Sequence, residues 1–277
     1  MLIIPVLDML ENGNEASMIT SSQESDVLLT ILGFGLAANI LALVSLVALV
    51  KLNKSQSMAM NVLTIALIIT DLLGLLTVSL PTLLSYSKGK WLGGVHLCHF
   101  QSVMKISCIL ASGCLSTVIA SDRLTAIQNP FFYQKYFTHK QSRASIGYAW
   151  VLSLVVSVLP LFGFGGIKRY HTYCTINWFA TTNLSRIYTY FFGIFGVMLV
   201  AVVVMTNIRI AMTGFSVQLQ RRPTDLRSEV SLERRIPNSR KQSCTSTNMK
   251  KQIGKIAIAI SFLFPITWLP FMVSFCD

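Results

Sequence analysis

Six long apolar runs constrain this chain more than any other feature of its sequence. They cover approximately residues 27–50, 58–84, 97–127, 144–164, 188–208 and 256–275. Each is long enough to cross a bilayer as a helix, which takes about 20 residues, whereas β-barrel strands would be about half as long. Because a spanning segment must satisfy its own backbone hydrogen bonds, the runs predict an all-α, polytopic membrane helix bundle. The low share of charged residues, 12%, agrees with this class.

The positions of Lys and Arg predict the orientation of the bundle. Residues 51–57, 128–143 and 209–255 together hold 16 of these residues, and residues 1–26, 85–97 and 164–187 hold 5. Because cytoplasmic loops retain positive charge, we expect an extracellular N-terminus in the cell membrane. The net charge of +12 is then mainly a topology signal, with anionic membrane lipids as neighbours. Nucleic acid is not an expected partner, since no soluble basic module is present.

These boundaries divide the chain into two units. Residues 1–26 are predicted to form an extracellular N-terminal tail, and residues 27–277 a transmembrane domain with a cytoplasmic loop over 209–255. Six crossings return Asp277 to the outside, so a six-helix protein and a truncated longer bundle both remain open. No nucleotide-binding Gly-rich loop, zinc spacing or nucleophile elbow occurs, so neither an enzyme nor a metal-dependent protein is predicted.

The outer face carries two cysteines and a glycosylation sequon. Cys98 opens the third run and Cys174 lies in the second outer loop, so both meet the oxidising compartment. We expect a disulfide between them that ties the loop across the mouth of the bundle. Asn183 begins an outer Asn-Leu-Ser sequon and is a candidate for glycosylation, whereas the sequon at Asn53 falls on the predicted inner side.

Two acidic positions within the runs are candidates for function, because ionisable groups in a bilayer are costly unless paired or hydrated. Asp71 lies in the middle of the second run. It either hydrogen-bonds to Asn39 of the first run or helps to hold a small hydrated cation. Asp122 and Arg123 close the third run at its inner end. They act either as a snorkelling anchor or as a lock that a cytoplasmic partner opens.

Lys105 and a Trp-Leu-Pro sequence add two further candidates. Lys105 lies about two turns into the third run, where its ammonium either faces the bundle interior as a counter-ion for an acidic ligand or snorkels to the headgroups. Pro270 removes a backbone hydrogen bond beside Trp268 in the sixth run. This pair is either a ligand-sensitive hinge or a packed aromatic in an ordinary kinked helix.

Taken together, these residues resemble the rhodopsin-like (class A) G-protein-coupled receptors. The resemblance is carried, in chain order, by Asn39, Asp71, Cys98, Asp122, Arg123, Trp150, Cys174, Trp268, Leu269 and Pro270. It implies a seven-helix receptor fold of which six helices are present, with the chain stopping after the sixth. It also implies a heterotrimeric G protein as partner, Asp122 and Arg123 as its switch, and an allosteric sodium ion held by Asp71 with Ser112.

Within that family the chain is most similar to the prostanoid receptors. "TDLLG" at 70–74, "SYSKGKWLGGVHLC" at 85–98, "LPLFGFGG" at 159–166 and "HTYCTINWF" at 171–179 carry the similarity. It implies that Thr82, Tyr86 and Thr172 hold a ligand carboxylate and that Trp178 helps to form a lid. Tyr173 departs from the pattern, since those receptors usually have Trp there.

The expected function is therefore a receptor for a lipid-derived, anionic ligand of prostanoid type that signals through a heterotrimeric G protein. A class A receptor for a peptide or another lipid is the first alternative, and a truncated, non-signalling form is the second. A transporter is a remote alternative, because such proteins tend to show inverted repeats and interrupted helices, and neither is found here.

Overall fold

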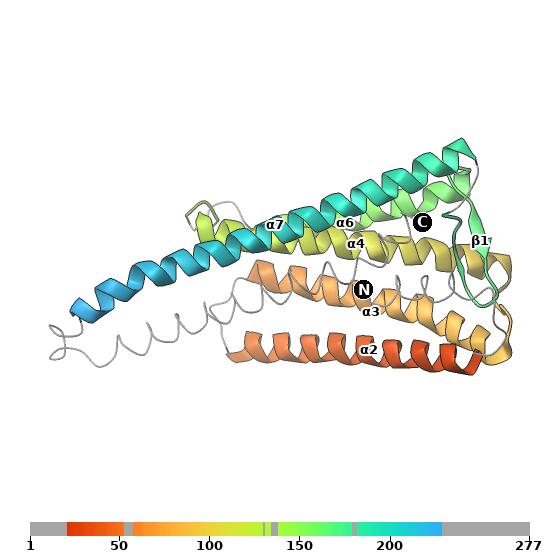
Figure 1. The fold of residues 1–277 in the computed structure, drawn as a ribbon, viewed down its shortest axis with the longest axis horizontal. Helices are drawn as coiled ribbons and strands as arrows, with labels where there is room; N and C mark the ends of the chain where they lie inside the picture. Colours follow the sequence, from red (N-terminus) through yellow and green to blue (C-terminus); the bar gives the residue numbers. More distant parts are fainter. Residues whose placement is uncertain (1–20, 53–57, 130, 134–137, 179–181, 229–277) are drawn as a thin grey trace.

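The computed structural model describes residues 21–52, 58–129, 131–133, 138–178 and 182–228. Long helices dominate this part of the chain, running lengthwise beside one another in Figure 1. They are α2 (Ser21–Leu52), α3 (Met58–Lys88), α4 (Gly94–Gln128), α6 (His139–Val158) and α7 (Asn183–Ser228). A short 3-10 turn η1 (Leu159–Phe162) and two strands, β1 (Ile167–Arg169) and β2 (Cys174–Ile176), lie between α6 and α7.

Helix α4 is the centre of the bundle. It packs against α3, α6 and α7, whereas α2 packs on the far side of α3. Its buried face contains many small side chains, among them Ser107, Ala111, Ser112 and Gly113. Small residues allow helices to approach closely in a membrane, where dispersion contacts rather than the hydrophobic effect hold helices together. The sequence of α4 therefore explains its central place.

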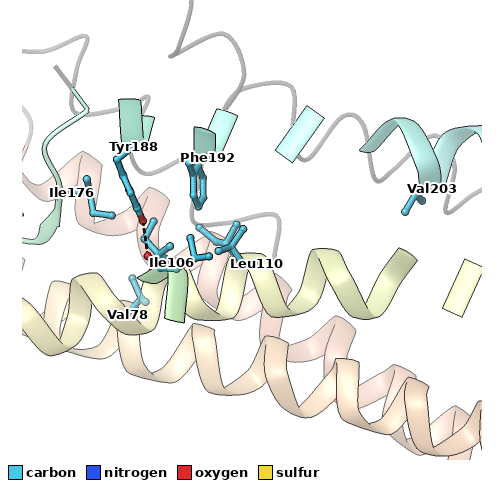
Figure 2. Close-up of a cluster of buried hydrophobic side chains, with 9 residues drawn as sticks. Val78, Ile106, Leu110, Ile176, Tyr188, Phe192 and Val203 are labelled. Atoms are coloured by element: carbon cyan, nitrogen blue, oxygen red, sulfur yellow. Dashed lines mark hydrogen bonds between the residues drawn. The ribbon is translucent and has the colours of Figure 1, made fainter. Parts of the chain in front are cut away.

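The largest apolar cluster lies where α4, α6 and α7 meet. Figure 2 shows Phe192 of α7 directed toward Leu110 of α4, with Ile176 of β2 beside Tyr188. The hydroxyl of Tyr188 donates a hydrogen bond of 3.1 Å to the backbone carbonyl of Val156 in α6. This bond joins α7 to α6 and gives the buried phenol a partner.

The described helices have the length and exterior of a membrane bundle. Four spans are apolar and long enough to cross a bilayer, at residues 61–88, 94–128, 139–162 and 183–213, and α2 contains a shorter apolar stretch over 32–48. Large apolar side chains such as Phe34, Val151 and Ile194 point outward. The prediction of an all-α membrane bundle is thus confirmed, while the sixth predicted span, 256–275, lies outside the described residues.

Most of the helices are longer than the apolar runs that predicted them, whereas α6 begins earlier than its run and ends before residue 164. Helix α2 begins at Ser21, within the predicted tail, and the first outer connection shortens to residues 89–93. Helix α7 continues to Ser228, so the part of the predicted cytoplasmic loop up to that residue is helical. Hydropathy marks only the portion of a helix that suits hydrocarbon, whereas backbone hydrogen bonding can continue beyond it into polar surroundings.

Three features shape the outer end of the bundle. Strands β1 and β2 pair antiparallel with Arg169 opposite Cys174, and this hairpin lies at the end of the helices in Figure 1. Gly94 has a φ of +63° at the start of α4, a conformation that favours glycine. A Cβ on Gly93 would come within 2.6 Å of the Trp91 ring, so the turn from α3 into α4 depends on both glycines.

Candidate functional site

The predicted disulfide joins the hairpin to the outer end of α4. Cys98 and Cys174 are bonded with a Cα–Cα distance of 5.2 Å, and both are buried. The bond links residues 76 apart in the sequence and confirms the prediction. Strand β2 is thereby held against α4 at the outer end of the bundle.

Gln101 forms a hydrogen-bonded junction that sequence reasoning missed. Its amide nitrogen donates to the backbone carbonyl of Val78 and to the hydroxyl of Thr82, both at 2.9 Å. Its amide oxygen accepts the backbone N–H of Cys174 at 2.9 Å. The side chain is completely buried, so α3, α4 and β2 meet at one amide. A polar residue one turn after the helix-opening cysteine was the only sequence signal for it.

Lys105 lies inside the bundle rather than at the headgroups. Only 2% of its surface is exposed, and its Nζ sits 5.3 Å from the centroid of the Tyr173 ring. This placement favours the interior alternative over snorkelling. A buried ammonium beside an aromatic face is stabilised by the electron-rich ring, yet the desolvation of its charge still favours an anion nearby.

The two predicted threonines, Thr82 and Thr172, differ in their hydrogen-bonding capacity. The hydroxyl of Thr82 donates to the Val78 carbonyl at 2.8 Å and accepts from Gln101. A hydroxyl has one proton, so Thr82 cannot donate to a ligand carboxylate without giving up that bond. Thr172 Oγ1 is buried and has no hydrogen-bond partner within the described part of the chain. Thr172, next to Tyr173, is therefore the better placed of the two to receive an anion.

More hydroxyl groups of this kind lie on the surrounding elements. Ser102 of α4, one turn before Lys105, and Thr175 of β2 are buried, and their hydroxyl oxygens find no partner among the described residues. Ser79 of α3 is in the same situation. Buried polar atoms are rarely left unsatisfied, so each of these hydroxyl groups is a candidate partner for a polar ligand group or water.

Tyr86 and Trp178 are the remaining two predicted ligand residues. Tyr86 is half-buried near the outer end of α3. Trp178 is also half-buried, and its ring lies 5.3 Å from that of Phe192, tilted by 47°. Trp178 thus packs on the apolar cluster of Figure 2 from the loop side, a position compatible with the predicted lid.

The predicted sodium core is partly assembled across α3 and α4. Ser112 donates a hydrogen bond of 2.6 Å to Oδ1 of Asp71, which is half-buried. The amide of Asn39 instead donates to the carbonyl of Gly35 within its own helix, at 2.8 Å. Asp71 and Ser112 are therefore in contact as predicted, while the side-chain hydrogen bond of Asn39 to Gly35 stays within α2.

At the inner end, Asp122 is held by a residue that sequence reasoning missed. The hydroxyl of Tyr133, in the segment 131–133, donates to Oδ2 of Asp122 at 3.2 Å. Asp122 is 1% exposed, and neither its Oδ1 nor Nε of Arg123 finds a hydrogen-bond partner in the described ranges. A buried carboxylate does not suit a snorkelling anchor, so the lock is the better interpretation. Trp268 and Pro270 lie outside the described residues.

Asn183 occupies the first position of α7 and is exposed. The hydroxyl of Thr182 donates to that of Ser185, the third residue of the sequon, at 2.8 Å. The acceptor amide of Asn183 is thus on the surface at the outer end of the bundle. Glycosylation of Asn183 stays a prediction.

Comparison with known proteins places these features in context. Residues 38–276 match the family "7 transmembrane receptor (rhodopsin family)". The human prostaglandin E2 receptor EP4 subtype is 28% identical over 178 residues, which is 63% of this chain and 36% of that receptor. The D(1)-like dopamine receptor of Oreochromis mossambicus is 26% identical over 250 residues, 83% of this chain and 59% of that protein.

A solved structure shares the arrangement of the helices. The crystal structure of squid rhodopsin superposes with a TM-score of 0.72 at 18% sequence identity, covering 94% of this chain and 73% of that one. At this identity the likeness supports the fold alone. The chain also spans only about a third of the length of the EP4 receptor, 36%.

Proposed function

This chain belongs to the rhodopsin family of seven-transmembrane receptors, and from that premise we propose that it binds a lipid-derived acid of prostanoid type and signals through a heterotrimeric G protein. Family membership makes it a multi-pass membrane receptor rather than an enzyme, as the sequence predicted. The match to a receptor family also argues against the transporter alternative. The likeness to the EP4 receptor, 28% identity, supports the prostanoid class of ligand.

The observation that carries the proposal is the burial of the Lys105 ammonium beneath the disulfide-tied hairpin. A ligand carboxylate at Lys105 would form an ion pair with an ammonium that is already shielded from water, so little further desolvation of that ammonium would be needed. The hydroxyl of Thr172 would donate a charge-assisted hydrogen bond to the same carboxylate. Tyr86, Thr82 and Trp178 would surround the chain of the ligand at the outer end, with Thr82 acting mainly through Gln101.

The same ammonium disfavours an amine ligand. The match to a dopamine receptor covers more of the chain than the match to the EP4 receptor, at a similar identity. A cationic ligand placed at Lys105 would, however, meet a like charge in surroundings of low dielectric constant, where repulsion is strong. A receptor for a peptide or another lipid stays as the alternative, since an acidic side chain or phosphate could also pair with Lys105.

Signal transmission is assigned to the inner half of the bundle. In this proposal the ligand biases the hinge at Trp268 and Pro270, and the G protein engages Arg123 after Asp122 is released. A sodium ion at Asp71 and Ser112 would favour the resting state. The tie between Tyr133 and Asp122, 3.2 Å, supports a resting lock at this end.

A second-messenger assay in cells that display the receptor at their surface tests the proposal. The panel holds prostaglandins, their methyl esters, arachidonate and dopamine, with cyclic AMP and calcium as readouts. We expect responses to acids, weaker responses to the esters, and none to dopamine. The variant Lys105→Met should lose the preference for acids, whereas Lys105→Arg should retain it. If no compound in the panel gives a response although surface expression is confirmed, the proposal of a prostanoid ligand is refuted.

A further inference from the structure

Four side chains form a column from the bundle interior to the outer surface. The Lys105 ammonium lies over the ring of Tyr173, with 5.3 Å between Nζ and the ring centroid. The ring of Tyr173 stacks on that of Tyr170, with 5.0 Å between centroids and 9° between planes. The ammonium of Lys168 lies over Tyr170 at 4.7 Å. The order is therefore cation, ring, ring, cation.

The hairpin fixes the two rings before any ligand arrives. The backbone N–H of Tyr170 donates to the carbonyl of Tyr173 at 2.9 Å, which closes the turn between the strands. Cys174 follows Tyr173 directly and is bonded both to Cys98 and to the amide oxygen of Gln101. The ring that faces Lys105 is thus anchored from three sides, by the disulfide, the Gln101 bond and the stacked Tyr170.

The two ends of the column lie in different surroundings. At the inner end Lys105 is 2% exposed and Tyr173 is 7% exposed, whereas Lys168 at the outer end is exposed. A cation on an aromatic face gains most when both are desolvated, and little where water competes. The ring of Tyr173 should therefore contribute to holding its ammonium far more than Tyr170 contributes to holding Lys168.

We propose that Tyr173, supported by Tyr170, is a positioning residue that holds the Lys105 ammonium in the bundle and thereby makes the site selective for acids. A positioned ammonium gives an acid its full electrostatic gain without the cost of ordering a flexible lysine. An ester of the same shape carries no charge, so it can accept a hydrogen bond from the ammonium but gains no charge–charge attraction. The selectivity rests on the proposed function, whereas the contact between ring and ammonium does not.

Fluorination of the ring tests the contact without any ligand. Tyr173 is replaced by phenylalanine and then by phenylalanines of increasing fluorination, which weakens the negative face of the ring while nearly preserving its shape. The purified full chain is melted in detergent. We expect the thermal midpoint to fall stepwise with fluorination, and this slope to disappear when Lys105→Met is added. Lys168→Met is the matched control and should leave the slope unchanged. An equal slope with and without Lys105 would overturn the proposal.

Ligand binding tests the selectivity, with prostaglandin E2 and its methyl ester as the probes. Tyr173→Leu should weaken binding of the acid roughly threefold to thirtyfold, the range between an exposed and a desolvated cation–π contact, and leave the ester nearly unchanged. Tyr173→Phe should restore the difference between the two probes. Equal weakening of both would show that the ring only packs, and would overturn the proposal. If neither probe binds the unchanged receptor, the prostanoid function fails, and the melting series still decides whether the ring holds Lys105.

Discussion

The side-chain amide of Gln101 accepts the backbone N–H of Cys174 at 2.9 Å, so the loop that covers the bundle is bonded to α4 by a hydrogen bond as well as by the disulfide. The other end of the same amide donates to Val78 and Thr82 of α3. The hairpin and the two helices beneath it therefore form one hydrogen-bonded unit at the mouth of the receptor.

Removing this amide should destabilise the outer half of the bundle. Gln101→Met keeps the length of the side chain but leaves the buried N–H of Cys174 without its partner, which costs about 1–3 kcal/mol. The measurement is the thermal midpoint of the purified receptor. Gln128→Met, at the exposed end of the same helix, is the matched control and should melt like the unchanged chain.

A double-mutant cycle distinguishes a shared network from separate contacts. Because Thr82 accepts from Gln101, the effects of Thr82→Val and Gln101→Met should be non-additive. Additive losses of stability would contradict the junction.

Sodium should stabilise the receptor through Asp71. If the carboxylate and the Ser112 hydroxyl help to hold the ion, a tenfold excess of sodium over its dissociation constant adds about 1.4 kcal/mol of stability. Thermal melting in sodium chloride is compared with melting in choline chloride at equal ionic strength. Asp71→Asn should abolish the difference, and Ser112→Ala should reduce it. Identical melting of the unchanged receptor in the two salts would exclude the sodium site.

Loss of the Tyr133 hydroxyl should raise basal signalling. Tyr133→Phe removes a hydrogen bond to a buried carboxylate, an interaction that contributes about 1.5–3 kcal/mol when the acceptor is charged. We therefore expect a several-fold rise in ligand-free nucleotide exchange by the G protein in membranes. Tyr148→Phe, on the exposed face of α6, is the control and should behave like the unchanged receptor. Unchanged or lower basal exchange in Tyr133→Phe would refute the lock.

Glycosylation gives a test of orientation that is independent of any ligand. Asn183 is exposed at the outer end of α7, so treatment with an endoglycosidase should shift the mobility of the protein from cells. Asn183→Gln should remove the shift, whereas Asn53→Gln should not, because the transferase acts only on the lumenal side. A shift that persists in Asn183→Gln but not in Asn53→Gln would invert the predicted topology.

Much of the outer site could be recognised from local sequence, yet two of its assignments depended on packing. Lys105 was ambiguous between the interior and the headgroups, because a long side chain on a helix can reach either. Thr82 was a candidate carboxylate donor, but its proton is already used by Val78. The hydroxyl of Thr172 retains that capacity among the described residues, a distinction that residue type cannot make.

Local signals in the chain were enough to predict the membrane bundle, its orientation and the disulfide, because apolar length, basic loops and outer cysteines can each be read without knowing the packing. Hydropathy did not predict that α7 continues as a helix to Ser228, because its last part is polar. The partners of Gln101, Tyr133 and Tyr173, by contrast, became clear from the packing of the helices and the hairpin. Gln101 meets Thr82 and Cys174 across 19 and 73 residues of sequence. A polar side chain within a helix does not indicate which distant group it will face, since the packing of the helices settles that pairing.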